Sequence, residues 1–338
     1  MRVLSAGVVV KRREFIITLL GSATAGLPLA AAGQPEGTRV VGVLAFGSLA
    51  GARADMAHAQ RRLAEIGYVE GHNLAFEYRA ADNREDRLAT LVGDLVQRQV
   101  SVIVTPSGPS IAAAKAATTS IPIIFLTGFD PVASGFVASL NQPGGNVTGI
   151  SVLNTEVQAK RLELLRELTP RAKSIAFLHS SSNLVSGYDR LLKDMQTAAN
   201  ALNVELLLVE VNRSEDIEGA FTKMVGAHAE ALLVSADAFM FSNQAALVDQ
   251  AARHRIPAVY PVRAFATRGG LASYGTDYPE AFRQVGGYIG RVLNGERPEN
   301  LPVQQVTKLQ LVVNTRTANA LGLTISPNLL ARADEVIE

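Results

Sequence analysis

Two charged residues follow apolar stretches of the kind that form buried strands. Asp237 comes just after residues 230–235, and Arg263 directly follows residues 256–262. A carboxylate in such a position could hold an ammonium group, and a guanidinium could bind a carboxylate through two parallel hydrogen bonds. Aspartate is also a favoured helix N-cap, and an exposed arginine commonly forms a surface salt bridge. The sequence therefore predicts ligand contacts at both positions and leaves these structural alternatives open.

Hydroxyl groups and glycines gather after the apolar stretches in the first half of the chain. Ser107, Gly108 and Ser110 open an expected helix, whose backbone N–H groups and positive dipole end can hold an anion. Because serine is a favoured cap, capping alone explains the same loop equally well. The other polar candidates for ligand binding are Ser48, Thr127, Asp130 and Ser181.

Aromatic side chains lie close to these polar candidates in the sequence. Phe46, Phe129, Phe239 and Tyr274 could form the walls of a site for an apolar or aromatic ligand. Aromatic residues at strand ends more often belong to a hydrophobic core. We therefore include Phe46 and Tyr274 among the candidate ligand contacts, with core packing as the alternative.

Groups suited to catalysis or metal binding are sparse. The chain has no cysteine, and its 5 histidines lack the paired spacing that a helix-borne metal site needs. The sequence contains no G-x-S-x-G, G-x-G-x-x-G or P-loop motif. His179 at a strand end could act as a base, although such a histidine is more often packed or hydrogen-bonded. We expect no catalytic residue, no metal and no cofactor.

The composition restricts the classes of partner. The 338 residues are 48% hydrophobic and 19% charged, which favours two packed domains over one small domain or a disordered chain. Lysine and arginine number 32 against 31 acidic residues, a balance that gives no general attraction for nucleic acid or anionic lipid. The expected partner is a small molecule that is recognised locally.

Residues 1–32 have the organisation of an export signal. A basic cluster at residues 11–13 precedes an uncharged stretch, residues 15–32, that ends in small residues. Residues 12–16, Arg-Arg-Glu-Phe-Ile, resemble a twin-arginine signal, and the alanines at 30 and 32 offer a cleavage site. The stretch is short for a permanent membrane anchor. We therefore expect a soluble mature protein in the periplasm, with a buried N-terminal helix as the alternative.

After residue 38, apolar stretches alternate with longer amphipathic stretches, as in an α/β fold with a parallel sheet. The first set has expected strands at 39–46, 73–79, 100–105 and 121–127, and helices near 53–66, 86–98 and 109–118. The second set has expected strands at 174–179, 204–211, 230–235 and 256–262, and helices near 187–201, 215–228 and 242–254. Matching strands start about 130–135 residues apart, which predicts two similar Rossmann-like lobes. One large sheet is the alternative.

Two glycine-rich segments, residues 144–149 and 269–275, end the two sets. Because glycine tolerates backbone changes that other residues resist, these segments are candidate bends between the lobes, or else surface turns. Beyond them we expect a helix near 279–294, a strand at 308–313 and a helix at 315–321. The expected N-terminal lobe comprises residues 38–150 and 275–305, and the expected C-terminal lobe comprises 151–274 and 306–338.

Several motifs along the chain resemble one known family. They are Asp130-Pro131-Val132, the Leu-Asn-Gln-Pro-Gly-Gly-Asn-Val-Thr-Gly stretch at 140–149, Gly-Tyr-Val-Glu-Gly-His-Asn-Leu at 67–74, the segment 269–275, and the closing stretches 301–305 and 329–335. Together they span nearly all of the chain after residue 38. They resemble the substrate-binding proteins of ABC transporters, in the group related to tryptophan- and tyrosine-type uptake receptors.

The resemblance implies a type I periplasmic-binding-protein fold, with two lobes joined by a three-crossover hinge. It also implies ligand capture for an inner-membrane ABC permease and its ATPase, without chemistry on the ligand. By position it carries ligand binding onto Ser48, Ser107, Asp130, Asp237 and Tyr274. Relatives often have asparagine- or proline-rich loops where this chain has serines at 180–182. The resemblance therefore gives less support to ligand contacts from this loop of the second lobe. A monomer is expected.

These observations predict a receptor that closes two lobes around a small polar or aromatic carboxylate, or an amino-acid-like ligand. A ligand that contacts both lobes favours the closed arrangement. One alternative is a sensory binding module that signals to a membrane kinase or chemoreceptor. The other is an exported α/β hydrolase or racemase that uses His179.

Overall fold

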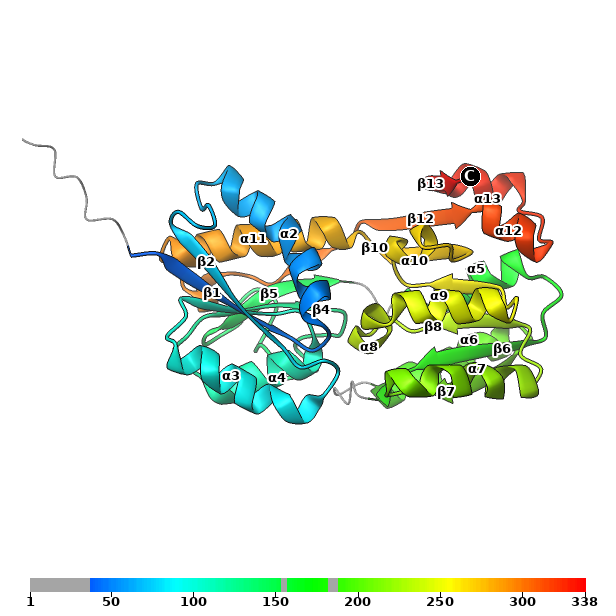
Figure 1. Ribbon diagram of the computed structural model, residues 1–338, viewed down its shortest axis with the longest axis horizontal. Helices are drawn as coiled ribbons and strands as arrows, with labels where there is room; N and C mark the ends of the chain where they lie inside the picture. The colour runs from blue at the N-terminus through cyan, green and yellow to red at the C-terminus, as the bar shows by residue number, and fades with distance from the viewer. Residues whose placement is uncertain (1–36, 153–156, 182–187) are drawn as a thin grey trace, which may run out of the picture. The chain divides into compact units, whose positions relative to one another are not determined.

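The computed structural model describes residues 37–152, 157–181 and 188–338. The expected export signal at residues 1–32 lies outside the described residues. Residues 39–338 form one contact unit, which contains two β-sheets (Figure 1). Within the described ranges, no helix is long and apolar enough to cross a bilayer.

The first sheet has six strands in the order β11-β5-β4-β3-β1-β2, and all of its neighbouring strands are parallel. The strands are β1 (Arg39–Ala45), β2 (Leu74–Ala80), β3 (Val102–Thr105), β4 (Ile123–Thr127), β5 (Val147–Val152) and β11 (Gln304–Val306). Runs of valine and isoleucine fill β1, β3 and β4, because helices cover both faces of this sheet.

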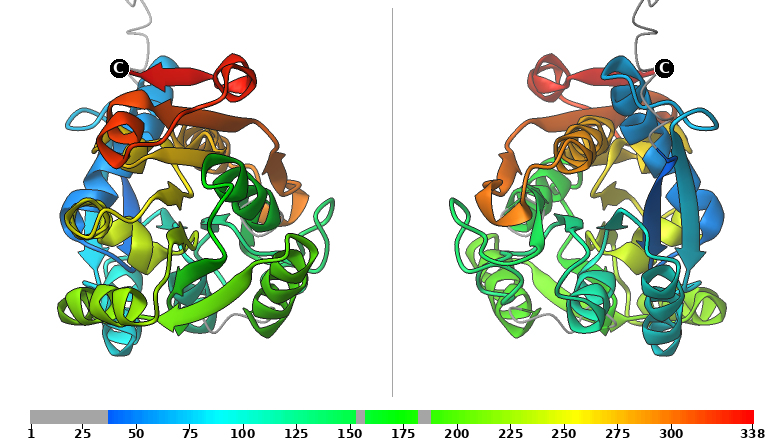
Figure 2. Two further views of the ribbon diagram at one scale, coloured as in Figure 1. Left: turned by 90° about the vertical axis from the view of Figure 1, so that its right-hand side faces the viewer. Right: turned by 90° about the vertical axis from the view of Figure 1, so that its left-hand side faces the viewer.

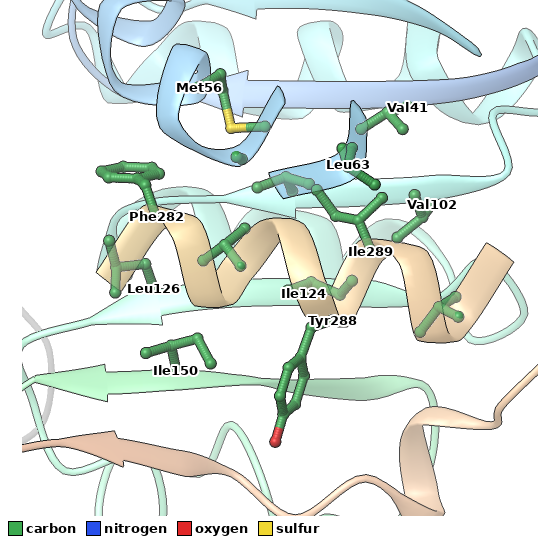
Figure 3. Packing of buried hydrophobic residues seen from close by; sticks show 14 of the residues in the cluster. Val41, Met56, Leu63, Val102, Ile124, Leu126, Ile150, Phe282, Tyr288 and Ile289 are labelled. Carbon is green, nitrogen blue, oxygen red and sulfur yellow. The ribbon is translucent and has the colours of Figure 1, made fainter. Parts of the chain in front are cut away.

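Four helices pack on the first sheet, two on each face (Figures 1 and 2). α2 (Leu49–Glu65) and α11 (Tyr278–Leu293) share one hydrophobic cluster, in which Met56, Phe282 and Ile289 meet Ile124 of the sheet (Figure 3). α3 (Leu88–Gln97) and α4 (Gly108–Ala117) share the cluster on the other face. We refer to this sheet and these helices as the first lobe.

The second sheet has seven strands in the order β13-β12-β10-β9-β8-β6-β7. The strands are β6 (Ser174–His179), β7 (Glu205–Glu210), β8 (Ala231–Val234), β9 (Ala258–Tyr260), β10 (Ala272–Thr276), β12 (Leu309–Asn314) and β13 (Glu335–Ile337). Only the β10–β12 pair is antiparallel among the strands of this sheet that the structure describes.

Helices cover both faces of the second sheet as well, and we refer to them together as the second lobe. One face carries α5 (Gln158–Leu168), α6 (Tyr188–Ala201), α12 (Thr315–Leu321) and α13 (Pro327–Arg332). The other carries α7 (Ile217–Gly226), α8 (Ala238–Ser242), α9 (Gln244–Arg253) and α10 (Arg263–Thr267). Short 3-10 turns lie at Glu85–Arg87, Ser214–Asp216 and Pro298–Asn300.

The chain changes sheet three times along the described residues. It leaves the first sheet after Val152 in β5, returns at Asp277 between β10 and α11, and leaves again at residues 307–308 between β11 and β12. This connectivity confirms the expected α/β fold with two lobes and three crossovers. The lobe boundaries drawn from the sequence remain a prediction, and β5, β10 and β11 each extend one or two residues beyond them.

The structure corrects the expectation that the glycine-rich segments bend between the lobes. Gly144 and Gly145 have φ of 71° and 87°, but residues 147–149 of that segment belong to strand β5. A Cβ atom at Gly149 would lie 2.2 Å from the carbonyl oxygen of Phe125, so a neighbouring strand requires this glycine. In β10, a Cβ atom at Gly275 would lie 2.0 Å from the carbonyl oxygen of Pro261.

Glycines also set the distance between α2 and α11. A Cβ atom at Gly286 would lie 2.4 Å from the carbonyl oxygen of Ala59, and one at Gly290 would lie 2.2 Å from Cδ1 of Ile66. The backbone contact at Gly286 cannot be relieved by a side-chain rotation. The two helices therefore pack closely enough to exclude even a methyl group at that position.

We predict that Gly286→Ala lowers the free energy of unfolding by about 1–3 kcal/mol, the usual cost of overpacking. Gly287→Ala is the matched control, because its nearest neighbour would be the Arg62 Nε at 3.9 Å. The control should be neutral or slightly stabilising, since alanine favours the helix by up to ~1 kcal/mol over glycine. Urea unfolding of the variants measures both effects, and equal stability of the two would contradict the close packing.

Candidate functional site

The loops that follow the strands of the two sheets meet at one place in the structure. Gly47 follows β1, and a Cβ atom there would lie 2.1 Å from the Oγ atom of Ser242 at the end of α8. Ala238, at the start of α8, packs against the first-lobe cluster that contains Phe46. In parallel sheets, ligands bind beyond the carboxyl ends of the strands. The candidate site therefore lies where these loops approach each other.

The serines at the start of α4 form a small hydrogen-bonded cluster. Ser107 is the N-cap, and its Oγ accepts a hydrogen bond from the Ser110 backbone N–H at 3.4 Å. The two Oγ atoms lie 2.6 Å apart, and the Ser110 hydroxyl is also 2.9 Å from the Ser107 carbonyl oxygen. Gly108 and both serines are buried. Capping thus accounts for both hydroxyls, and anion binding by this helix end remains a proposal.

Three further candidates of the first lobe are held by their own backbone. Ser48 caps α2 and accepts from the Gly51 N–H at 3.2 Å. Thr127 Oγ1 accepts from the Phe129 N–H at 3.2 Å, and Asp130 Oδ1 accepts from the Val132 N–H at 2.8 Å. The loops at this edge therefore have a defined shape that requires no ligand.

The aromatic candidates occupy different environments. Phe46 and Phe239 are 1% and 0% exposed and belong to hydrophobic clusters, which leaves them little surface to offer a ligand. Phe129 is half-buried. Tyr274 lines a cavity of about 410 Å³ between α5 and β12, with Leu164 and Leu311 among its neighbours. Ser107 and Asp237 lie at the starts of α4 and α8, which do not line this cavity. Tyr274 is therefore not grouped with the other candidates.

Asp237 is the N-cap of α8, the role that was the alternative to ligand binding for this residue. Its Oδ1 accepts from the Met240 N–H at 2.9 Å, and its Oδ2 accepts from the Ser235 hydroxyl. The side chain is 7% exposed, and burial raises the pKa of Asp237, while these hydrogen bonds act in the opposite direction. A backbone hydrogen bond from Ser180 also connects Asp237 to the loop after β6.

Arg263 forms a bidentate salt bridge, which was the alternative to binding the carboxylate of a ligand. Its Nε and Nη2 donate to the two carboxylate oxygens of Glu335 at 2.6 Å and 2.7 Å. This contact connects α10 to β13, the last strand of the second sheet. The guanidinium fork is therefore already occupied by a carboxylate of the same chain.

Ser181 and His179 lie at the end of β6. Asn212 Nδ2 donates to the Ser181 hydroxyl oxygen at 2.9 Å, and the Ser181 N–H donates to Asn212 Oδ1 at 2.9 Å. His179 is 5% exposed, its ring lies 5.7 Å from that of Phe177 in a tilted arrangement, and its pKa is lowered mainly by burial. His179 is thus a packed histidine, which was the alternative to a catalytic base. No cluster of three or more potential metal ligands occurs among the described residues.

Two charged residues were missed by the sequence analysis. Asp55 on α2 has an exposed side chain, but many protein atoms lie around its carboxyl group, and the resulting partial desolvation raises its pKa to about 7. Arg161 on α5 is 0% exposed; its Nε donates to the Tyr274 carbonyl at 2.5 Å and its Nη1 to Gln158 Oε1 at 2.6 Å. Burial lowers the pKa of Arg161 to about 9. Both residues lie within helical stretches, where local sequence gives no signal of the burial of Arg161 or of the protein atoms around the Asp55 carboxyl group.

We predict that Asp237→Ala lowers the free energy of unfolding by about 0.5–2 kcal/mol, because alanine cannot cap α8. Asp237→Asn is the matched variant, since its amide oxygen can still accept from the Met240 N–H. Chemical unfolding should place the asparagine variant close to wild type. If both variants were equally unstable, the capping role of the carboxylate would be refuted.

The raised pKa of Asp55 predicts a pH-dependent stability. Between 3.8 and about 7 the folded protein holds this proton more tightly than the unfolded chain, so the contribution of Asp55 to stability falls as pH rises. Asp55→Asn should therefore gain stability relative to wild type over that interval, measured by urea unfolding at several pH values.

Asp94→Asn provides the opposite control for this titration. Hydrogen bonds from Arg79 and Arg98 lower the pKa of Asp94, so its contribution to stability rises with pH through the acidic range. Replacing Asp94 should cost more stability as the carboxylate ionises. If the stability difference between the Asp55→Asn variant and wild type stayed constant across the same interval, the raised pKa of Asp55 would be contradicted.

The chain matches known binding proteins over most of its length. The family model described as "ABC transporter substrate binding protein" matches residues 40–337. A curated relative, the tyrosine-binding protein of Clostridioides difficile, is 29% identical over 264 residues, which are 78% of this chain and 75% of the relative.

Solved structures agree with this match. The ABC domain in complex with L-Trp from Streptococcus pneumonia is 27% identical with a TM-score of 0.79, covering 89% of this chain and 100% of that one. A conserved domain protein from Vibrio cholerae is 28% identical with a TM-score of 0.80, covering 88% and 99%. The matched family consists of binding proteins, which agrees with ligand capture without catalysis. The chain belongs to the family of ABC transporter substrate-binding proteins.

Proposed function

We propose that this protein is the receptor of an ABC-type uptake transporter and captures an aromatic amino acid between its two lobes. The observation that carries the proposal is the approach of the two sets of strand-end loops, at Gly47 and Ser242, in a chain of this family. A ligand held there contacts both lobes at once. Ligand binding then favours the closed arrangement, which the transporter recognises.

The ligand class is supported by the relatives and by the charges of this chain. One relative is a tyrosine-binding protein, and one solved structure holds L-Trp. In this chain, the N-terminus of α4 at Ser107 suits a carboxylate. Among the described residues, no cation lies within salt-bridge distance of Asp55, whose desolvated carboxyl group suits an ammonium group. The first lobe thus offers a candidate partner for each of the two charges of an amino acid.

The proposed partners and location follow from the family and from the first 32 residues. The receptor is exported through its N-terminal signal, by the twin-arginine or the general route, and acts as a monomer in the periplasm. It delivers the ligand intact to an inner-membrane permease and its ATPase. The nearly equal numbers of basic and acidic residues, 32 and 31, fit a partner that is a small molecule and not a nucleic acid.

The closure mechanism has a defined energetic requirement. Shifting a two-state equilibrium from about 1:99 to 99:1 needs ~5.5 kcal/mol of differential affinity for the closed state. Two charge-assisted hydrogen-bonding groups and one buried aromatic ring can supply free energy of this size. An amino acid with an aromatic side chain carries all three.

We predict that L-tryptophan or L-tyrosine stabilises the mature chain against thermal unfolding. At about 100 times its dissociation constant, a ligand that binds only the folded state adds ~2.7 kcal/mol. D-Tryptophan and glycine serve as controls for stereochemistry and for the aromatic ring. NMR of the recovered ligand should show it chemically unaltered, as a receptor requires. Absence of stabilisation by either L-amino acid at millimolar concentration would rule out this ligand class.

A further inference from the structure

Helix α8 is bound firmly to the second lobe on one side. Phe239 and Met240 are both 0% exposed and belong to the hydrophobic cluster formed with α7 and α9. The Asp237 cap fixes the start of the helix, and the Ser242 hydroxyl donates to the Ala238 carbonyl at 2.8 Å. The helix therefore moves with the second lobe as a rigid element.

The opposite side of α8 meets the first lobe. Ala238, Phe241 and Ser242 occupy positions i, i+3 and i+4, so they share one helix face. Ala238 packs against the first-lobe cluster with Phe46. Phe241 borders the second-lobe cluster and contacts, at 5.2 Å in an edge-to-face arrangement, the ring of Tyr278, which packs against the clusters of both lobes. Ser242 approaches Gly47, where a Cβ atom would lie 2.1 Å from its Oγ and 3.4 Å from its Cβ.

The first-lobe surface at this contact is held by the loop after β2. The Asn83 N–H donates to the Phe46 carbonyl at 2.8 Å, and the Asp82 N–H donates to the Gly47 carbonyl at 3.2 Å. These bonds keep Gly47 from retreating when α8 approaches. The buried Oδ1 of Asn83 has no hydrogen-bond partner among the described residues and lies 4.0 Å from the Cβ position of Gly47.

We propose that the α8 face formed by Ala238, Phe241 and Ser242 is the closing contact of this receptor, and that position 47 has no room for a bulky side chain when this contact is made. This inference rests on the proposed function, because it states how the same two lobes hold the ligand. Gly47 need not touch the ligand. It acts as a positioning residue, since a bulky side chain there keeps α8 away from the first lobe and depopulates the closed state.

Depopulation of the closed state has a measurable effect on affinity. When only a fraction of the protein can adopt the binding-competent state, the apparent dissociation constant rises in inverse proportion to that fraction. A bulky side chain at position 47 therefore weakens binding although every ligand contact is still present. A smaller residue at position 242 removes the clash and restores the affinity.

A cross-linking experiment tests the contact directly, because the chain has no cysteine of its own. The Cβ–Cβ distance of 3.4 Å between positions 47 and 242 is close to the ~3.8 Å typical of a disulfide. Gly47→Cys combined with Ser242→Cys should form a disulfide on mild oxidation, and faster with L-tryptophan or L-tyrosine present. Gly93→Cys combined with Ser242→Cys is the control, since no atom lies within 4 Å of the Cβ position of Gly93.

The outcomes separate this inference from the proposed ligand class. Cross-linking at the level of the Gly93 control, in a protein that binds either amino acid, overturns the closing contact and leaves the proposed function intact. Cross-linking that neither amino acid accelerates supports the contact and counts against the ligand class.

Steric variants give an independent measurement. Gly47→Val should weaken binding of L-tryptophan or L-tyrosine by about tenfold or more and abolish the ligand-induced decrease in radius of gyration. Adding Ser242→Gly should restore affinity to within about threefold of wild type. Gly93→Val should leave affinity unchanged, and thermal unfolding verifies that each variant is folded. Wild-type affinity of the Gly47→Val variant would overturn the proposal.

Discussion

The close packing of α2 against α11 is the constraint on which the two-lobe arrangement depends. α2 follows β1, whereas α11 comes after five strands of the second sheet, β6 to β10. Gly286 and Gly290 let the two helix backbones approach, and together they cover one face of the first sheet. The first lobe is complete only once the chain has built most of the second. Neither lobe is an independent segment of sequence, and the return of the chain to the first lobe at α11 follows from this packing requirement.

The strand-end loops are shaped by their own hydrogen bonds and are therefore ordered without a ligand. Ser48, Ser107 and Asp237 each cap the helix that follows, and Asp130 orders the turn after β4. Capping and ligand binding are therefore compatible functions of such residues, because an ordered helix end presents its remaining N–H groups in fixed directions. A site formed in this way loses little conformational entropy on binding.

Local periodicity was sufficient to predict most strands and helices, including their repetition in two lobes. Periodicity did not predict β5, because the glycines of residues 144–149 suggested a flexible connection. In the structure, Gly149 is required because the backbone of Phe125 in the neighbouring strand lies too close for a side chain. Long-range partners were equally inaccessible. Arg263 was correctly placed after a strand, but its partner Glu335 lies 72 residues away. The burial of Arg161 and the raised pKa of Asp55 arise from surroundings that only the assembled fold provides.

The buried guanidinium of Arg161 has a mechanical consequence for the hinge. It joins α5, which follows the first crossing, to the main chain of β10, which precedes the second. Gly275 leaves room for this contact, since a Cβ atom there would lie 3.0 Å from Nη2 of Arg161. Two of the three connections are thus clamped together on the side of the second lobe. In the proposed closure, rotation between the lobes would therefore be absorbed by the crossing residues themselves.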